Sequence, residues 1–432
     1  MWLLNTKDVT LEFFNEAQVP NHPYAILSHV WGPEEVLWHE LQENRASVQN
    51  RAGWKKITRF CATARKYGFA YAWIDTCCID KRSSADLTEA INSMYKYYYD
   101  AAICLVYLQD VHRYVDQGNN SPLEATAVTR AQLLTAVRTS RWFSRGWTLQ
   151  EILAPARRCF LAADWYEIEE GDDLLDSIAE SSGIGKELLE NRNRLRNLCV
   201  AERMKWASKR ETTRGEDIAY SLMGIFNVNM PVLYGEGPKN AFKRLQLEIM
   251  QSSFDMTIFA WRGNYKSSGL LAQSPADFAD APHAGLWAPR SLSSFSMTNL
   301  GLTIRLNITD KQFSFRQRHG EVPNRESGEH PDEATLLAAL QCDVLESTGQ
   351  WRIPMVFLEP VIGARFFVNG NSCKAYRRIR CAEWVTVPSK RLVGCPYEDI
   401  IILQDEQYEL VRQSAEQHMS RRGIASSITA FE

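Results

Sequence analysis

The sequence predicts an α/β domain built on a parallel sheet, followed by a separate and mainly β domain. In the first 170 residues or so, short and almost wholly apolar segments alternate with amphipathic helical ones. Such strands are typical of parallel sheets that are covered on both faces. Beyond about residue 256, apolar and polar residues alternate singly, which is the period of half-buried strands. A chain of 432 residues is also too long for one ordinary core.

The strands of the first domain are predicted from its apolar runs, which are Tyr24–Trp31, Tyr71–Asp75, Ile103–Leu108 and Arg158–Trp165. Apolar residues at helical spacing predict the helices between them, which are Trp54–Lys66, Leu87–Tyr99 and Ala127–Arg138. In open parallel sheets, ligands bind beyond the carboxyl ends of the strands. Ser28, His29 and Asp75 stand at those ends and mark the expected site.

These patterns divide the chain into three regions. Residues 1–170 form the α/β core, residues 171–255 read as a helical extension, and residues 256–432 form a mainly antiparallel β domain. The β domain is predicted from alternation at 300–306 and 351–357 and from the runs ARFFVNG, EWVTV and DIIIL, while the polar stretch 316–335 is predicted to be a loop.

Composition excludes several classes of partner and site. Lys and Arg number 49 against 52 Asp and Glu, so the net charge is −3 and no nucleic-acid or anionic-membrane partner is expected. The longest apolar runs are too short to cross a bilayer and no signal peptide is recognised, so we expect a cytoplasmic protein. The ten Cys show no CxxC pair, and neither a metal site nor a disulfide framework is expected.

The segment RGWTLQEIL (145–153) places a large aromatic and a carboxylate one helical turn apart. At 100° per residue, Trp147 and Glu151 point the same way, and the apolar residues Leu149, Ile152 and Leu153 face the sheet. The functional interpretation is a ligand-binding wall with a catalytic carboxylate. The alternative is a surface helix whose Glu151 pairs with Arg145 or Arg158.

The residues at the strand ends have alternative interpretations too. Ser28, His29 and Trp31 form either a pocket wall that binds phosphate or ribose, or a turn in which His29 bonds to the backbone. Asp75 either accepts hydrogen bonds from ribose hydroxyls or caps the loop before the helix Leu87–Tyr99.

The pair Cys77-Cys78 suggests a different class of enzyme. With His29 it could form a Cys–His hydrolase, but two cysteines after a buried strand are more often inert packing.

Three blocks in order, SHVWG (28–32), WIDTCCID (73–80) and RGWTLQE (145–151), resemble the HET (heterokaryon incompatibility) domain of filamentous fungi. The segments DIAYSLMGIFNVNMPVLYGEG and AFKRLQLEI resemble the region that commonly comes after these blocks in such proteins, so the resemblance covers roughly residues 22–262. It implies a cell-death or self/non-self signalling protein that needs a protein partner or self-association for activation.

HET domains in turn resemble TIR domains, which implies a TIR/flavodoxin-like parallel sheet with added helices. SRGWTLQEIL is similar to the TIR pattern Ser-x-Trp-Cys-x-x-Glu-Leu, with Thr148 where Cys is usual, and no counterpart of the TIR loop after the second strand is visible. The glutamate of that pattern is needed in enzymatic TIR domains to cleave NAD between nicotinamide and ribose. The resemblance assigns this role to Glu151, with NAD as substrate and no bound cofactor.

A carboxylate suits this chemistry because positive charge develops on the ribose as the cationic nicotinamide leaves. With a reference pKa near ~4.3, Glu151 is expected to be ionised at neutral pH. Ser28, His29, Trp31, Asp75 and Trp147 are expected to line the nucleotide site. The alternative function is a non-catalytic interaction module that uses the same surface.

Overall fold

A computed structural model describes residues 1–115, 126–281, 283–285, 293–310, 335–346, 348–361, 366–368, 371–383, 385–392 and 394–421. The chain divides into two compact units. The first comprises residues 1–196 and 209–241, and the second comprises residues 197–208 and 242–432. The segment 171–255, predicted as one helical extension, therefore contributes to both units. The two units are described separately.

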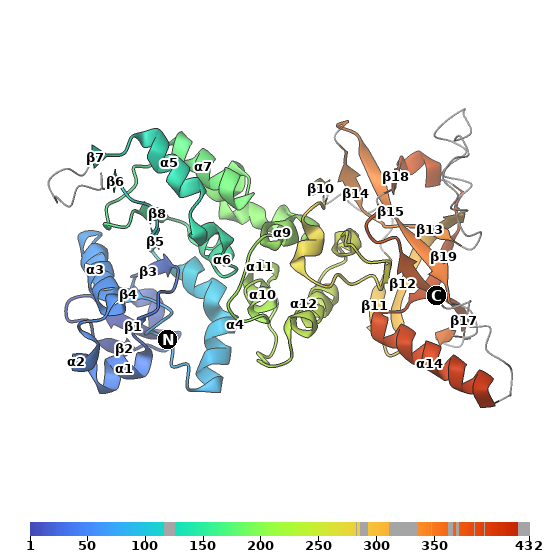
Figure 1. Ribbon diagram of the computed structural model, residues 1–432, viewed down its shortest axis with the longest axis horizontal. Coiled ribbons are helices and arrows are strands. Elements are labelled where there is room, and N and C mark those ends of the chain that lie inside the picture. The colour runs from blue at the N-terminus through green and yellow to red at the C-terminus, as the bar shows by residue number, and fades with distance from the viewer. Residues whose placement is uncertain are drawn as a thin grey trace. The chain divides into compact units, whose positions relative to one another are not determined.

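The first unit is a mixed α/β structure around a six-stranded sheet (Figure 1). Its strands lie in the order β2 (Leu11–Phe13), β1 (Trp2–Asn5), β4 (Tyr71–Trp73), β3 (Tyr24–His29), β5 (Ile103–Tyr107) and β8 (Arg158–Leu161). Strands β4, β3, β5 and β8 are parallel neighbours, which confirms the predicted parallel sheet. The antiparallel strands β1 and β2 extend it at one edge and were not predicted.

The order of the parallel strands reverses at β3. The chain passes from β3 to β4 on one side and then crosses to β5 on the other side of β3. A reversal of this kind separates neighbouring loops at the carboxyl ends of the strands and opens a crevice where ligands bind in α/β sheets. Ser28 and His29 are the last two residues of β3 and stand at this point.

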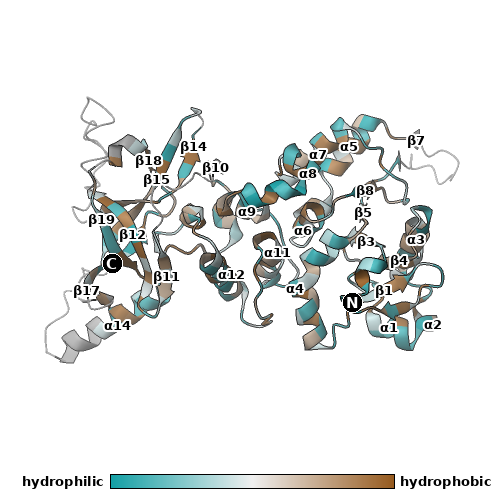
Figure 2. Ribbon diagram, turned by 180° about the vertical axis from the view of Figure 1, so that it is seen from behind, coloured by the Kyte–Doolittle hydropathy of each residue, from teal (hydrophilic) through white to brown (hydrophobic). Residues whose placement is uncertain are grey.

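The helices of the first unit are α1 (Trp38–Glu43), α2 (Arg45–Val48), α3 (Ala52–Lys66), α4 (Ser84–Asp100), α5 (Arg130–Arg138), α6 (Thr148–Leu153), α7 (Asp172–Ser182), α8 (Lys186–Glu190), α10 (Asp217–Tyr220) and α11 (Met223–Phe226). Strands β6 (Tyr114–Val115) and β7 (Thr126–Ala127) form a separate two-stranded ribbon. Helix α3 buries Ile57, Phe60, Cys61 and Ala64, the residues that predicted it, and both hydrophilic and hydrophobic residues are visible along α3 and α4 in Figure 2. These helices form because one apolar stripe packs on the sheet.

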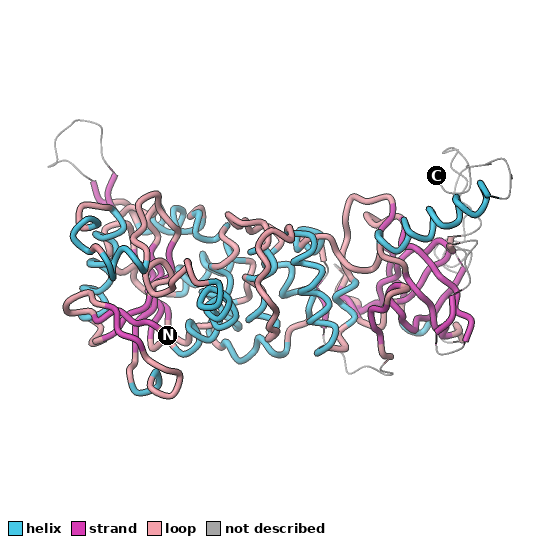
Figure 3. The backbone as a smooth tube through the Cα atoms, turned by 90° about the horizontal axis from the view of Figure 1, so that it is seen from below, coloured by secondary structure: helices cyan, strands magenta, loops and turns pink. Residues whose placement is uncertain are grey.

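The second unit is rich in β-structure, as the alternating pattern predicts. Strands β12 (Gly301–Asp310), β13 (Leu336–Ala339), β15 (Trp351–Pro360), β17 (Asn371–Ile379) and β19 (Tyr397–Ile402) pair in a closed ring, because β17 bonds to both β15 and β19 while β12 bonds to both β13 and β19. Figure 3 shows the strands of this small barrel in magenta, near the C-terminus. Of its pairings only β17 with β19 is parallel.

The burial of side chains along β12 confirms the alternation of buried and exposed residues that the sequence predicts. Leu302, Ile304 and Leu306 of β12 are buried, and Arg305 between them is exposed. A core cluster of Leu337, Ala339, Met355, Phe357 and Val387 lies on the opposite face of these strands, because Leu337 and Ala339 pair with Thr309 and Asn307.

The remaining strands of this unit are β9 (Ser267–Ser268), β10 (His283–Gly285), β11 (Phe295–Thr298), β14 (Asp343–Leu345), β16 (Phe366–Val368) and β18 (Val385–Val387). Its helices are α9 (Val200–Ala207), α12 (Pro238–Ser252), which begins in the first unit, and α14 (Asp405–Arg421). Most of the predicted polar loop 316–335 lies outside the described residues.

Candidate functional site

Strand β3 ends in two residues whose side chains lead to two different networks. Successive side chains of a strand point to opposite faces of its sheet. Ser28 therefore faces the helices α4 and α6, and His29 faces α3. The single pocket predicted from the sequence is divided between these two faces.

The first network surrounds Glu151. The Ser28 hydroxyl donates a hydrogen bond of 2.5 Å to Oε2 of Glu151 and accepts one of 2.7 Å from the indole Nε1 of Trp142. The hydroxyl of Tyr98 in α4 donates to the carbonyl of Leu27 at 2.9 Å and also interacts with the carboxyl group of Glu151. Residues from β3, α4, α6 and the turn before α6 thus converge on one carboxyl group.

The environment of Glu151 favours its neutral form. Burial raises the pKa of Glu151 to about 8, and the nearby charge of Asp75 adds to the rise, whereas hydrogen bonds from Ser28 and Tyr98 oppose it. The side chain is 8% exposed, so most of its surface has lost contact with water. The expectation that Glu151 is ionised at pH 7 is therefore wrong for this arrangement.

Helix α6 is buried on all sides, so Glu151 does not lie in an open cleft. All six residues from Thr148 to Leu153 are buried. The surface-helix alternative is wrong. No ion pair of Glu151 is found in the part of the chain that the structure describes. Arg145 donates to Thr213 instead, and Arg158 donates to the carbonyls of Ile152 and Pro155.

The start of α6 is held by a buried arginine that no pattern in the sequence singles out. Nη1 of Arg210 donates to the carbonyl of Arg145 and to the hydroxyl of Thr148, both at 2.9 Å. Burial lowers the pKa of Arg210 to about 10, while the field of Glu151 opposes this. Trp147 precedes the helix and donates to Asp217 at 3.2 Å, so its indole is fixed by α10.

The second network surrounds His29. Its Nδ1 lies 2.9 Å from Nζ of Lys56, and its Nε2 lies 3.1 Å from Oδ1 of Asp75. Because an ammonium group only donates, Nδ1 accepts the hydrogen bond from Lys56, and the N–H at Nε2 donates to Asp75. Lys56 also pairs with Glu35. The alternative in which His29 bonds to the backbone is not what the structure shows.

Asp75 connects this network to the surface. It accepts a hydrogen bond of 2.7 Å from Nε1 of Trp31, a residue that is 44% exposed. Burial opposes ionisation, but hydrogen bonds from His29 and Trp31 and the charge of Lys81 lower the pKa of Asp75 to about 2. Among the described residues, the hydrogen bonds to Asp75 come from side chains, His29 and Trp31, and not from the loop before α4, whose N-cap is Ser83.

Lys81 is a member of this network that sequence reasoning missed. Its Nζ lies 3.7 Å from the centroid of the Trp31 ring. Burial lowers the pKa of Lys81, and Asp75 opposes the shift. Only its position after a predicted strand could have singled it out.

Three negative findings concern the cysteines, metal binding and membrane-spanning helices. Cys77 and Cys78 are buried, and burial raises the pKa of Cys77 well above its usual value, which disfavours a reactive thiolate. Within the described ranges, no cluster of His, Cys, Asp or Glu could hold a metal ion, and no helix is both long and apolar enough to span a membrane.

Comparison with known proteins gives two family matches. Residues 24–151 match the family model of the heterokaryon incompatibility protein (HET), and residues 240–299 match a domain of unknown function (DUF8212). The first match includes Ser28, His29, Trp31, Asp75 and Glu151.

One curated relative is similar over a long stretch. The vegetative incompatibility protein HET-E-1 of Podospora anserina is 44% identical over 230 residues. This stretch is 52% of the present chain and 16% of that protein, so the chain corresponds to a small part of its relative's length. No solved structure matches the chain.

Proposed function

We propose that this chain, which carries a HET domain over residues 24–151, acts in heterokaryon incompatibility by cleaving NAD at Glu151. The resemblance drawn from its sequence blocks is confirmed by the family match and by the relative HET-E-1. The enzymatic activity, the cell-death outcome, the cytoplasmic location and the need for a protein partner or self-association are proposals that rest on this premise.

The observation that carries the proposal is the buried carboxyl group of Glu151, which bonds to Ser28 without a cation as partner among the described residues. A buried acid with a raised pKa beside a ligand-binding edge is a typical feature of functional sites. A purely structural role would be served equally well by glutamine, which needs no desolvation of charge.

The strand order supports a TIR/flavodoxin-like interpretation of the sheet. The parallel strands follow the order second, first, third, fourth, as in flavodoxin-like sheets that bind ligands at the reversal. Ser28 lies at this reversal and connects it to Glu151.

The proposed reaction breaks the bond between C1′ of ribose and the nicotinamide nitrogen. The electron pair leaves with nicotinamide and neutralises its ring, water adds to C1′, and one proton is released. The positive charge of the bound ring would lower the pKa of Glu151 and favour the carboxylate that stabilises the developing ribosyl cation. Trp31 and Trp147 would offer aromatic surfaces to the nucleotide.

The arrangement described is a closed one. Glu151 is 8% exposed, so a nucleotide reaches it only after movement around α6. We propose that self-association or a partner promotes this opening, and that the β-rich second unit regulates it or senses that partner. The alternative function is a non-catalytic interaction module in which Glu151 only stabilises α6.

The test is nicotinamide release from NAD by the purified chain over a wide range of protein concentrations. Glu151→Gln is compared with Glu187→Gln, a matched change of an exposed carboxylate on α8. Release by the parent and by Glu187→Gln, with loss in Glu151→Gln, supports the enzyme. Equal release by all three removes Glu151 from the mechanism, and no release at any concentration favours the interaction module.

A further inference from the structure

A cavity of about 500 Å³ lies along β8, the edge strand of the first sheet, away from Glu151. It is lined by the first residues of β8, by Ile103 at the start of β5, and by residues of α7 and α8. These are the amino ends of the strands, whereas Ser28 and His29 lie at a carboxyl end. The cavity is therefore separate from the site proposed for NAD.

The floor of the cavity is apolar. It consists of the side chains of Ile103, Phe160, Leu174, Leu175, Ile178 and Leu189. Five of these are buried and Leu175 is half-buried. A ligand with an aliphatic segment would remove this surface from water, at roughly 25 cal/mol per Å².

The rim of the cavity is acidic. Four exposed carboxylates line it, those of Glu167, Glu170, Asp172 and Glu190, against the two guanidinium groups of Arg157 and Arg158. Within the described residues, Glu170, Asp172 and Glu190 form no ion pair, and Arg158 donates to backbone carbonyls instead of carboxylates. The lining thus has an excess of negative charge, and Lys186, the cation near Asp172 and Glu190, pairs with Asp176.

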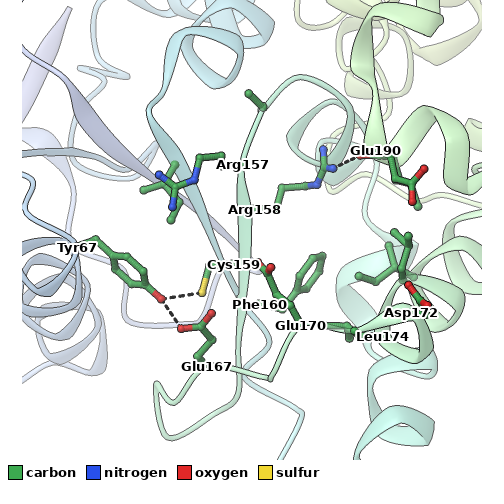
Figure 4. A pocket seen from close by; sticks show the side chains of 16 residues that line it. Tyr67, Arg157, Arg158, Cys159, Phe160, Glu167, Glu170, Asp172, Leu174 and Glu190 are labelled. Carbon is green, nitrogen blue, oxygen red and sulfur yellow. Dashed lines mark hydrogen bonds between the residues drawn. The ribbon is translucent and has the colours of Figure 1, made fainter.

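The carboxylates lie on both sides of the strand. Figure 4 shows Glu167 beside Tyr67 on one side of β8, and Asp172 and Glu190 on the other side. The Tyr67 hydroxyl donates to Glu167 at 2.7 Å and fixes that carboxylate in place. A matching ligand would carry positive charges that are separated by apolar linkers.

We propose that this cavity binds a linear aliphatic polyamine. Its ammonium groups would bind the carboxylates of Glu170, Asp172 and Glu190, and its methylene groups would cover the apolar floor. Anionic ligands are excluded by the charge excess. A bare divalent cation would bind the carboxylates but would leave the apolar floor of the cavity exposed to water. It should therefore bind more weakly than a polyamine. The site is independent of NAD cleavage.

The test uses calorimetric titration of the full chain with spermidine at about 0.15 M salt, where weak surface attraction is largely screened. We expect saturable binding with one ligand per chain. The double variant Glu170→Gln with Glu190→Gln should weaken binding at least tenfold. The control, Glu169→Gln with Glu187→Gln, removes the same charge from neighbouring exposed positions that do not line the cavity and should change affinity less than twofold.

A second comparison tests the floor. Leu175→Ser should weaken spermidine binding several-fold and leave the weaker binding of Mg²⁺ unchanged. Thermal unfolding verifies that each variant is folded. The proposal is overturned if spermidine gives no saturable heat, if both double variants lose affinity equally, or if Mg²⁺ binds as tightly as spermidine.

Discussion

Ser28 and Glu151 are 123 residues apart in the sequence, and the hydroxyl of one donates a hydrogen bond of 2.5 Å to the carboxyl group of the other. This contact joins the end of β3 to α6 at the point where the strand order reverses. It places an acid with a pKa of about 8 at the edge where parallel sheets bind ligands. The consequences for stability and ionisation can be measured.

The stability of the parent should fall relative to Glu151→Gln as pH rises. The folded state holds the Glu151 proton with a pKa of about 8, above the ordinary value of 4.5. The stability due to this group is full below about pH 4.5 and is lost as pH rises through about 8, by on the order of 4 kcal/mol. Urea unfolding of both proteins from pH 5 to 9 measures the difference, and curves that stay parallel would contradict the raised pKa.

Removal of the Ser28 hydroxyl should destabilise the first unit by about 1–3 kcal/mol, because Ser28→Ala takes away a hydrogen-bonding partner of both Glu151 and Trp142. Trp142→Phe removes the donor to Ser28 and also leaves a cavity, because Trp142 is only 1% exposed, so it should cost at least as much. In a double-mutant cycle the two changes should be less than additive, since they act on one network. Full additivity would show that the hydroxyl and the indole act independently.

Asp75→Asn should reduce the loss of folding stability that the parent shows as pH falls from about 4 to 2. The pKa of Asp75 is lowered to about 2, so its contribution is present above about pH 4 and is lost as pH falls toward 2. For this half-buried group we expect about 1–2 kcal/mol after allowance for solvent screening.

The control for Asp75 is Asp173→Asn, which removes an exposed carboxylate whose pKa is also lowered to about 2 by Arg130. It should have little effect on acid unfolding, because ion pairs at the surface are screened by water. Equal effects of the two variants would indicate that Asp75 behaves as an ordinary surface group.

Gly53→Ala should destabilise the protein by roughly 1–3 kcal/mol through overpacking. A Cβ atom at Gly53 would overlap the backbone at Glu34 and Glu35, in the segment that supplies the partner of Lys56. The matched change Gly32→Ala should be tolerated, because its Cβ would lie 3.6 Å from the nearest atom, Oε1 of Glu35. Thermal unfolding distinguishes the two, and a stable Gly53→Ala would mean that this segment shifts freely.

Much of the first unit is determined by the sequence alone. Apolar runs and helical spacing identified the four parallel strands and the helices α3 and α4, because burial on the sheet requires those patterns. Three short blocks showed the resemblance to the HET family, whose model matches residues 24–151, and position at a strand end selected Ser28, His29 and Asp75. The one-by-one alternation of apolar and polar residues identified the β-rich second unit. It did not show that five strands close into a barrel.

Only the tertiary structure decided what each site residue contacts. Ser28 and His29 are adjacent in the chain but face opposite sides of the sheet, so one meets Glu151 and the other meets Asp75 and Lys56. The short strand β1 is fixed by pairing with β4, and β2 is fixed by pairing with β1; neither has a strong pattern of its own. The ionisation of Glu151 depends on desolvation by elements remote in sequence, and no local pattern contains that information.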